Sequence, residues 1–362
     1  MKKVTTPDPL NHIHSSFLVD RLTALWALNE AGLGGILHAL QSPFTGIFVG
    51  GIAIILIALI AYFAEQKMTA LVKATLIVLI IKALVSPHSP LPAYLAVSFQ
   101  AIAGIFLFNL IPSHRLAALL LGITGLLESA FQKIITLTLL YGTSLWKSID
   151  LFFDYILQQF GLLGQMSSAH ASWGLILIYM LLYLISGILI GYLAGLLPLE
   201  LNRAGYFRDL SELKQEIALF KASGTDVRPT RPFWKKRLFS ITAVLFVIVL
   251  IFTILDPDFK GASKALYVLI RTGIVLMIWY FLLAPFLARL LRKYLHKQSI
   301  FYAADVERVL IIMPKLKNIS RLIWKRSAYL PFFRRWKNFL ILLILYTLTF
   351  EMADETSETD KK

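Results

Sequence analysis

The stretch GIFVGGIAIILIALIAYFA, residues 46–64, decides the fold class, because none of its nineteen residues is charged. A run of about 20 apolar residues is long enough to cross the ~30 Å hydrocarbon core of a bilayer. The rest of the chain has the same character. Of its 362 residues, 57% are hydrophobic and only 16% are charged, whereas an ordinary soluble domain has about 25% charged residues. The sequence predicts an all-α, polytopic transmembrane protein.

Further apolar runs lie on both sides of this stretch and predict additional spans. They cover roughly residues 69–85, 91–111, 115–143, 172–198, 238–255, 265–288 and 337–350. Segment 22–40 is a further candidate, although it contains Asn29 and Glu30. We expect about nine spans, or eight if segment 22–40 does not cross.

The distribution of Lys and Arg predicts the orientation, because these residues accumulate in cytoplasmic loops. Connection 199–237 holds nine of them and connection 289–337 holds thirteen, together 22 of the 36 in the chain. We therefore expect both connections and the N-terminus on the cytoplasmic side. The connections 41–45, 86–90 and 145–171 then fall outside, and they contain a single basic residue, Lys147. We attribute the net charge of +15 to this bias and to anionic lipid, not to nucleic acid.

The chain divides into two membrane blocks near residue 200. Block 1–200 has up to six spans and is rich in glycine. In it, Gly187, Gly191 and Gly195 form two consecutive GxxxG motifs, which are typical of close helix packing in membranes. A basic connector, 201–237, contains an amphipathic pattern over 203–222 that fits either the inner leaflet or a protein surface. Block 238–350 follows, and an acidic tail, 351–362, is expected outside.

Segment 305–328 lies in the second basic connection and predicts cytoplasmic amphipathic helices. Two apolar stripes occur in it, first Val306, Val309, Leu310 and Met313, then Leu316, Ile319 and Ile323. Pro314 separates them, and a proline disrupts a helix interior but is well tolerated in a first turn. We expect two short helices hinged at Pro314, each packing its stripe on another surface.

Several kinds of chemistry have no motif in this sequence. The chain has no cysteine, which excludes disulfides, thiol nucleophiles and Cys-ligated metals. It contains no GxxxxGK[ST], HExxH, GxSxG or GxGxxG motif. The sequence therefore predicts no enzyme activity, no cofactor and no metal site.

Polar residues deep in predicted spans are the candidates for a binding site, because hydrocarbon disfavours them. Gln100 lies near the middle of 91–111, and Glu128 and Gln132 share one helix face in 115–143. These three side chains either line a path for a ligand or ion, or hold helices together by hydrogen bonds. Lys73 and Lys82 lie near the ends of 69–85, where we expect them to reach the lipid headgroups.

Two stretches of the first membrane block resemble a known family. With SPFTGIFVGG (42–51) and SPHSPLPAYLAVSFQAIAG (86–104), residues 22–198 resemble the substrate-binding S component of energy-coupling-factor (ECF-type) transporters. Residues 238–350 look like the T component of the same systems, with DVERVLIIMPKLKNISRLIWKRSA (305–328) at the place of its coupling helices. The resemblance implies a multi-pass subunit in the bacterial inner membrane that imports a small solute of the vitamin or metal class.

The same resemblance implies a partner and a mechanism. ATP-binding-cassette ATPase subunits would bind in trans at the cytoplasmic face, with Arg321, Lys325 and Arg326 as docking candidates. Gln100, Glu128 and Gln132 would then lie on the ligand side. The alternative is a membrane scaffold or assembly protein that moves no solute and binds a cytoplasmic partner through its basic inner face.

Overall fold

The computed structural model describes residues 15–39, 44–86, 89–159, 171–201, 273–274 and 277–349. Helices dominate these ranges, and no strand occurs in them, which confirms the all-α prediction for this part of the chain. Three predicted features lie outside the described residues: the span 238–255, the connector helix 203–222 and the tail 351–362.

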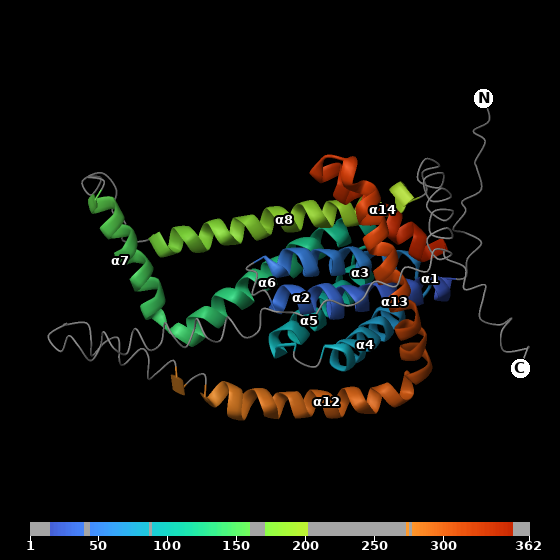
Figure 1. Ribbon diagram of the computed structural model, residues 1–362, viewed down its shortest axis with the longest axis horizontal. Helices are drawn as coiled ribbons and strands as arrows, with labels where there is room; N and C mark the ends of the chain where they lie inside the picture. Colours follow the sequence, from blue (N-terminus) through green and yellow to red (C-terminus); the bar gives the residue numbers. More distant parts are fainter. Residues whose placement is uncertain are drawn as a thin grey trace, which may run out of the picture. The chain divides into compact units, whose positions relative to one another are not determined.

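Figure 1 shows the described helices. In chain order they are α1 (Ser15–Leu28), the π-helical turn η1 (Asn29–Leu33), α2 (Gly34–Ala39), the π-helical turn η2 (Gly46–Gly50), α3 (Gly51–Phe63), α4 (Lys67–Val85), α5 (Leu91–Leu110), α6 (His114–Tyr141), α7 (Thr143–Gln159), α8 (Ala171–Leu201), the π-helical turn η3 (Ile278–Leu283), α12 (Ala284–Phe301), α13 (Ala303–Arg326), the short 3₁₀ turn η4 (Ser327–Tyr329) and α14 (Phe332–Thr349).

Five of these helices are long and apolar enough to cross a membrane. They are Gly46–Phe63, Lys67–Val85, Leu91–Leu110, His114–Tyr141 and Ala171–Leu201. Each lies within a few residues of a predicted span, so these five predictions are confirmed as helices. The result is consistent with a membrane protein, while the count of nine spans stays a prediction. α14 is not among the five, and it carries Arg334, Arg335 and Lys337 in its first two turns.

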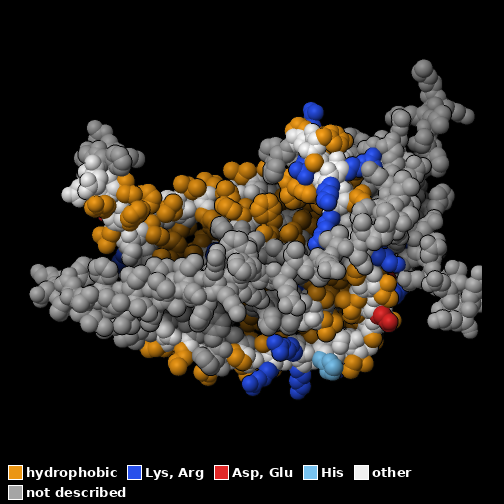
Figure 2. All heavy atoms as spheres, viewed as in Figure 1, with side chains coloured by type: hydrophobic (Ala, Val, Ile, Leu, Met, Phe, Trp, Pro, Cys, Tyr) orange, Lys and Arg blue, Asp and Glu red, His pale blue; other side chains and the backbone are white. Residues whose placement is uncertain are grey.

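The surface of α8 differs from that of α13 and α14. Figure 2 shows hydrophobic side chains along α8, whereas Lys and Arg gather over α13 and α14. Trp173, Leu177, Ile185 and Tyr192 of α8 are all exposed. An apolar surface of this extent is typical of a helix that contacts lipid.

Contacts divide the chain into two units. The first comprises residues 1–134, 175–217 and 287–362, and the second comprises 135–174 and 218–286. In the second unit α7 begins at Thr143 and covers much of the connection 145–171, where we predicted no span. Its indole Trp146 donates to Thr138 Oγ1 at 3.1 Å, and Asp150 accepts a 2.7 Å hydrogen bond from Ser172 N. α7 is amphipathic, and a search for long apolar runs does not detect that pattern.

Helix α1 lies at the centre of the first unit. It packs against α3, α4, α13 and α14. Leu18, Val19 and the seven residues from Arg21 to Ala27 are buried, which leaves no exposed stripe along this part of the helix. A helix buried on every side is typical of the core of a large bundle. Here the core helix also contains charged side chains.

Contacts between helix ends show that successive helices of the bundle run in opposite directions. Ser15 Oγ of α1 donates to Glu65 Oε1 at 2.8 Å, and Lys67 Nζ of α4 lies 3.4 Å from the Phe108 carbonyl oxygen near the end of α5. Gly195 of α8 packs on Arg115 of α6. These residues define one end of the bundle, which we call the Ser15 end. It brings together the segments that the sequence predicts to be cytoplasmic, and which side of a membrane it faces stays a prediction.

Glycines join α6 to α8. A Cβ atom at Gly122 would lie 2.3 Å from the Gly187 carbonyl oxygen and 2.6 Å from Gly191 Cα. These contacts are with backbone atoms, which cannot rotate away as a side chain can. The structure therefore confirms that the GxxxG motifs form a packing face.

The close approach of α6 and α8 predicts a large effect of Gly122→Val. We expect the variant to force the two helices apart and to lower the free energy of unfolding by about 1–3 kcal/mol or more. Thermal unfolding of the purified protein, followed by tryptophan fluorescence, measures it. The control is Gly174→Ala, because a Cβ atom there meets nothing within 4 Å. Equal melting temperatures for both variants would contradict the packing.

Candidate functional site

A buried ion pair connects η1 to α4. Lys82 Nζ lies 2.6 Å from Glu30 Oε2, and the two side chains are 1% and 3% exposed. The prediction that Lys82 extends to the headgroups is therefore wrong. Lys82 faces η1 instead of lipid, where it contacts the Glu30 carboxylate. A buried pair is tolerated only when both charges are partnered, since either charge alone is strongly disfavoured.

The residues beside this pair leave hydrogen-bonding capacity unused. Asn29 Nδ2 donates to the Val49 carbonyl oxygen of η2 at 2.9 Å. Asn29 Oδ1 and the indole Trp26 Nε1 are buried and have no hydrogen-bond partner among the described residues. Lys82 Nζ also lies 5.8 Å from the ring centroid of Tyr94, within range of a cation–π contact. One free acceptor and one free donor thus lie on the same stretch of α1 and η1.

The π-helical turn η2 extends the polar region toward α5, α6 and α8. A Cβ atom at Gly50 would lie 2.8 Å from Gln100 Nε2, so only glycine lets this amide approach the turn. Gly46 lies in the same way against Ser129 and Tyr183. Isolated π-helical turns occur frequently at functional sites. Here η1 and η2 contact each other. Gln100 thus meets η2 at Gly50, next to Val49, which accepts the hydrogen bond from Asn29. We call Asn29, Glu30 and Lys82, together with Gln100, the core polar cluster.

The three predicted ligand-side residues have different surroundings in the structure. Gln100 is 2% exposed and lies between Gly50 and Gly125, at the core polar cluster. Gln132 Nε2 donates to the Pro92 carbonyl oxygen at 3.0 Å, which ties α6 to the start of α5. Glu128 Oε2 is buried on α6 without a hydrogen-bond partner among the described residues. Only Gln100 joins the cluster; no described contact brings the other two to it.

Sequence reasoning missed Glu30 and Lys82 as a pair. Each charge was considered by itself, Glu30 as an obstacle to a span and Lys82 as a headgroup contact. The available signal was one acidic and one basic residue in two separate apolar segments, because opposite charges in hydrocarbon are expected to pair.

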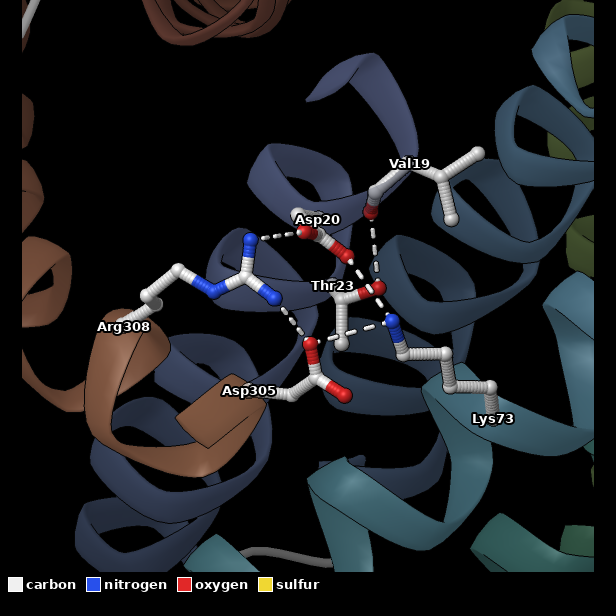
Figure 3. A network of polar contacts seen from close by, with 6 residues as sticks. All are labelled: Val19, Asp20, Thr23, Lys73, Asp305 and Arg308. Carbon is white, nitrogen blue, oxygen red and sulfur yellow. Dashed lines mark hydrogen bonds and ion pairs between the residues drawn. The ribbon is translucent and has the colours of Figure 1, made fainter. Parts of the chain in front are cut away.

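A second polar group joins three helices in a closed ring (Figure 3). Lys73 Nζ of α4 lies 3.0 Å from Asp305 Oδ1 and 3.7 Å from Asp20 Oδ1. Arg308 Nη1 lies 3.3 Å from Asp20 Oδ2, and Arg308 Nη2 pairs with Asp305 within α13. Each acid therefore contacts both bases. We call these four residues the charge ring.

The charge ring is more accessible than the core polar cluster. The Arg308 side chain is 53% exposed and that of Lys73 is 33% exposed. Both acids are more enclosed than the bases: the side chain of Asp20, which lies outside the five apolar helices, is 19% exposed, and that of Asp305 is 16% exposed. Burial raises the pKa of Asp20 above its ordinary value, although Lys73 and Arg308 act in the opposite direction. The ring is thus held by partly hydrated charges.

Helix α13 is continuous, so the predicted pair of helices hinged at Pro314 is wrong as stated. The helix runs through Pro314 from Ala303 to Arg326. The predicted stripes merge into one buried face, namely Val306, Val309, Ile312, Met313, Leu316, Ile319 and Ile323. α13 packs against α1, α4 and α14, which explains the continuity: tertiary contacts outweigh the hydrogen bond that proline removes.

The predicted docking residues lie on the last turns of α13. Arg321 and Lys325 are exposed, whereas Arg326 is half-buried. They lie around Ile323, the last residue of the apolar face that α13 packs against other helices of this chain. That apolar face is therefore covered, while Arg321 and Lys325 stay exposed.

Comparison with protein-family models, with curated proteins and with solved structures gives no match for this chain. In the described ranges, no group of three His, Asp or Glu side chains gathers as a metal site requires. The case for a function thus depends on the core polar cluster, the charge ring and α13.

The buried pair predicts an asymmetric mutational response. Glu30→Ala leaves Lys82 buried without its partner, and we expect a loss of about 3–5 kcal/mol in the free energy of unfolding. The double variant Glu30→Leu/Lys82→Met removes both charges and is expected to recover most of this loss. Thermal unfolding in detergent measures both. A double variant no more stable than the single one would show that the two residues do not act as a pair.

Proposed function

We propose that this chain is the solute-binding membrane subunit of an importer whose ATPase subunits bind it in trans. The observation that carries the proposal is the core polar cluster, in which Asn29, Glu30, Lys82 and Gln100 are all buried within a bundle of apolar helices. Ionisable side chains at such positions are costly and commonly mark the path of a solute or ion. The free Asn29 Oδ1 and Trp26 Nε1 supply an acceptor and a donor for a polar solute.

The energy source would be external to the chain, since its sequence has no phosphate-binding loop. Arg321 and Lys325 give α13 an exposed cationic surface for a partner. α13 packs directly on α1, and α1 continues into η1 with Asn29 and Glu30. A displacement of α13 by the ATPase would therefore act on the cluster through one rigid helix. The resemblance to ECF-type membrane components supports the same assignment.

The solute-binding role predicts that Gln100→Ala abolishes uptake while the protein still folds. Gln100 has its amide in the cluster, so its truncation removes polar contacts with the solute. The measurement is uptake of radiolabelled vitamins and divalent metals by cells that express the chain with its native partners. Gln132→Ala is the control, because Gln132 bonds the α5 backbone away from the cluster. Equal loss in both variants would indicate a structural effect.

The docking role predicts that reversal of Arg321 and Lys325 to Glu releases an ATPase. We expect wild-type protein purified from native membranes to carry ATPase activity in fixed stoichiometry, and the double variant to lose at least about 90% of it, as charged interface pairs do when reversed. Lys147→Glu on α7 is the matched exposed control. A wild-type preparation with no ATPase would overturn the proposal.

A membrane scaffold is the second candidate, and the exposed cations of α13 favour it equally. Transport predicts that reversal of Arg321 and Lys325 stops uptake of one solute. A scaffold predicts the loss of a partner complex with no solute phenotype.

A further inference from the structure

We propose that the charge ring is a reversible latch, by which the first half of α13 docks on α1 and α4 and leaves them. Its role as a regulator of transport rests on the function proposed above. The docking equilibrium itself is a property of this chain and is measured without a solute or an ATPase.

The way the four contacts are distributed allows α13 to separate from α1 and α4. Two of its four contacts cross the interface, Lys73 with Asp305 and Arg308 with Asp20. The other two remain within each side, Lys73 with Asp20 in the bundle and Arg308 with Asp305 on α13. When α13 moves away, the ring divides into two neutral pairs. No charge is left without a counter-charge.

Two other polar contacts, one of η1 and one of α1, lack this property. Separation of Glu30 from Lys82 leaves two buried charges unpaired, which is strongly disfavoured. Arg21 is 4% exposed and donates to the Thr347 and Leu348 carbonyl oxygens at 3.1 and 2.8 Å, so withdrawal of α14 would break two hydrogen bonds of a buried guanidinium. Among the described residues, these contacts are therefore costly to break, whereas the charge ring at the start of α13 can exchange.

Pro314 divides α13 so that only its first half need move. Proline has no N–H to donate to the Leu310 carbonyl, and bends in helices concentrate at such residues. Opening at this hinge uncovers the buried residues before it, Val306, Val309, Ile312 and Met313, while Leu316, Ile319 and Ile323 stay packed. The loss of apolar contact is therefore confined to the first half of α13, and it favours the docked state.

The position of the exposed cations would let a bound partner act on the latch. Arg321 and Lys325 lie on the second half of α13, across Pro314 from Asp305 and Arg308. A partner that binds the second half of α13 sets the angle of the helix at Pro314. The first half of α13 then docks at the charge ring or leaves it. The outcome is a change in the contacts of α1 near Asp20, on the helix that leads to Glu30.

A charge-swap experiment on the full chain tests the latch. The sequence has no cysteine, so nitroxide labels at Ser16→Cys on α1 and Ala304→Cys on α13 are unique. Asp305→Arg with Arg308→Asp keeps the net charge and the pair within α13, but it places like charges against Lys73 and Asp20. We expect the docked population, read as the short label distance by pulsed electron paramagnetic resonance, to fall roughly tenfold.

A compensating charge swap decides whether the loss of docking comes from the contacts across the interface. Asp20→Lys with Lys73→Asp, added to the first swap, restores opposite charges across the interface and is expected to return the short distance. A second measurement needs no substitution in the ring: about 1 M salt screens these partly exposed charges and should lengthen the distance in the labelled wild-type chain. A swap without effect, a compensating swap that fails to restore docking, or a distance unchanged by salt would each overturn the latch. Loss of uptake with normal docking would instead count against the proposed function.

Discussion

The arrangement of the first unit depends on one constraint: α1, which carries charged side chains, is enclosed by other helices. α1 is buried on every side along most of its length, yet it carries Asp20 and Arg21, and the turn η1 that continues it carries Asn29 and Glu30. Each of these finds its partner on another element: α4 and α13 for Asp20, α14 for Arg21, η2 for Asn29 and α4 for Glu30. Because an unpaired polar group in apolar surroundings is costly, these partners fix the rotation and register of the neighbouring helices.

This enclosure also separates two kinds of electrostatic contact. Contacts toward Glu30 are dry and specific, and they hold the helices that form the core polar cluster. Contacts near Asp20 are partly hydrated and are shared among three helices. The first kind suits a site that must keep its shape, and the second suits an interface that exchanges partners. Both lie along the continuous helix that α1 and η1 form, with Asp20 in α1 and Glu30 in η1.

The apolar helices could be predicted from the sequence because length and hydrophobicity alone determine them. The five confirmed segments needed no knowledge of their neighbours. The positions of Lys82 and Pro314 could not be found in this way. Whether Lys82 faces lipid or η1 depends on helix rotation, and whether Pro314 interrupts α13 depends on what the helix packs against. The burial of Gln100 could be predicted because a lone amide in an apolar run has few tolerated environments, whereas the surroundings of Glu128 depend on contacts that no local pattern specifies.

The π-helical turns η1 and η2 have a mechanical consequence. A π-helical turn holds one more residue than an α-helical turn, so each is a small reserve of chain length within a continuous helix. Return of η1 to α-helical geometry would pass that extra residue along the helix, with an advance of about 1.5 Å and a rotation of about 100°. Such a movement is a screw-like step past η2, which lies against η1. It can turn α2, which follows η1, while the Glu30–Lys82 ion pair keeps Glu30 in place.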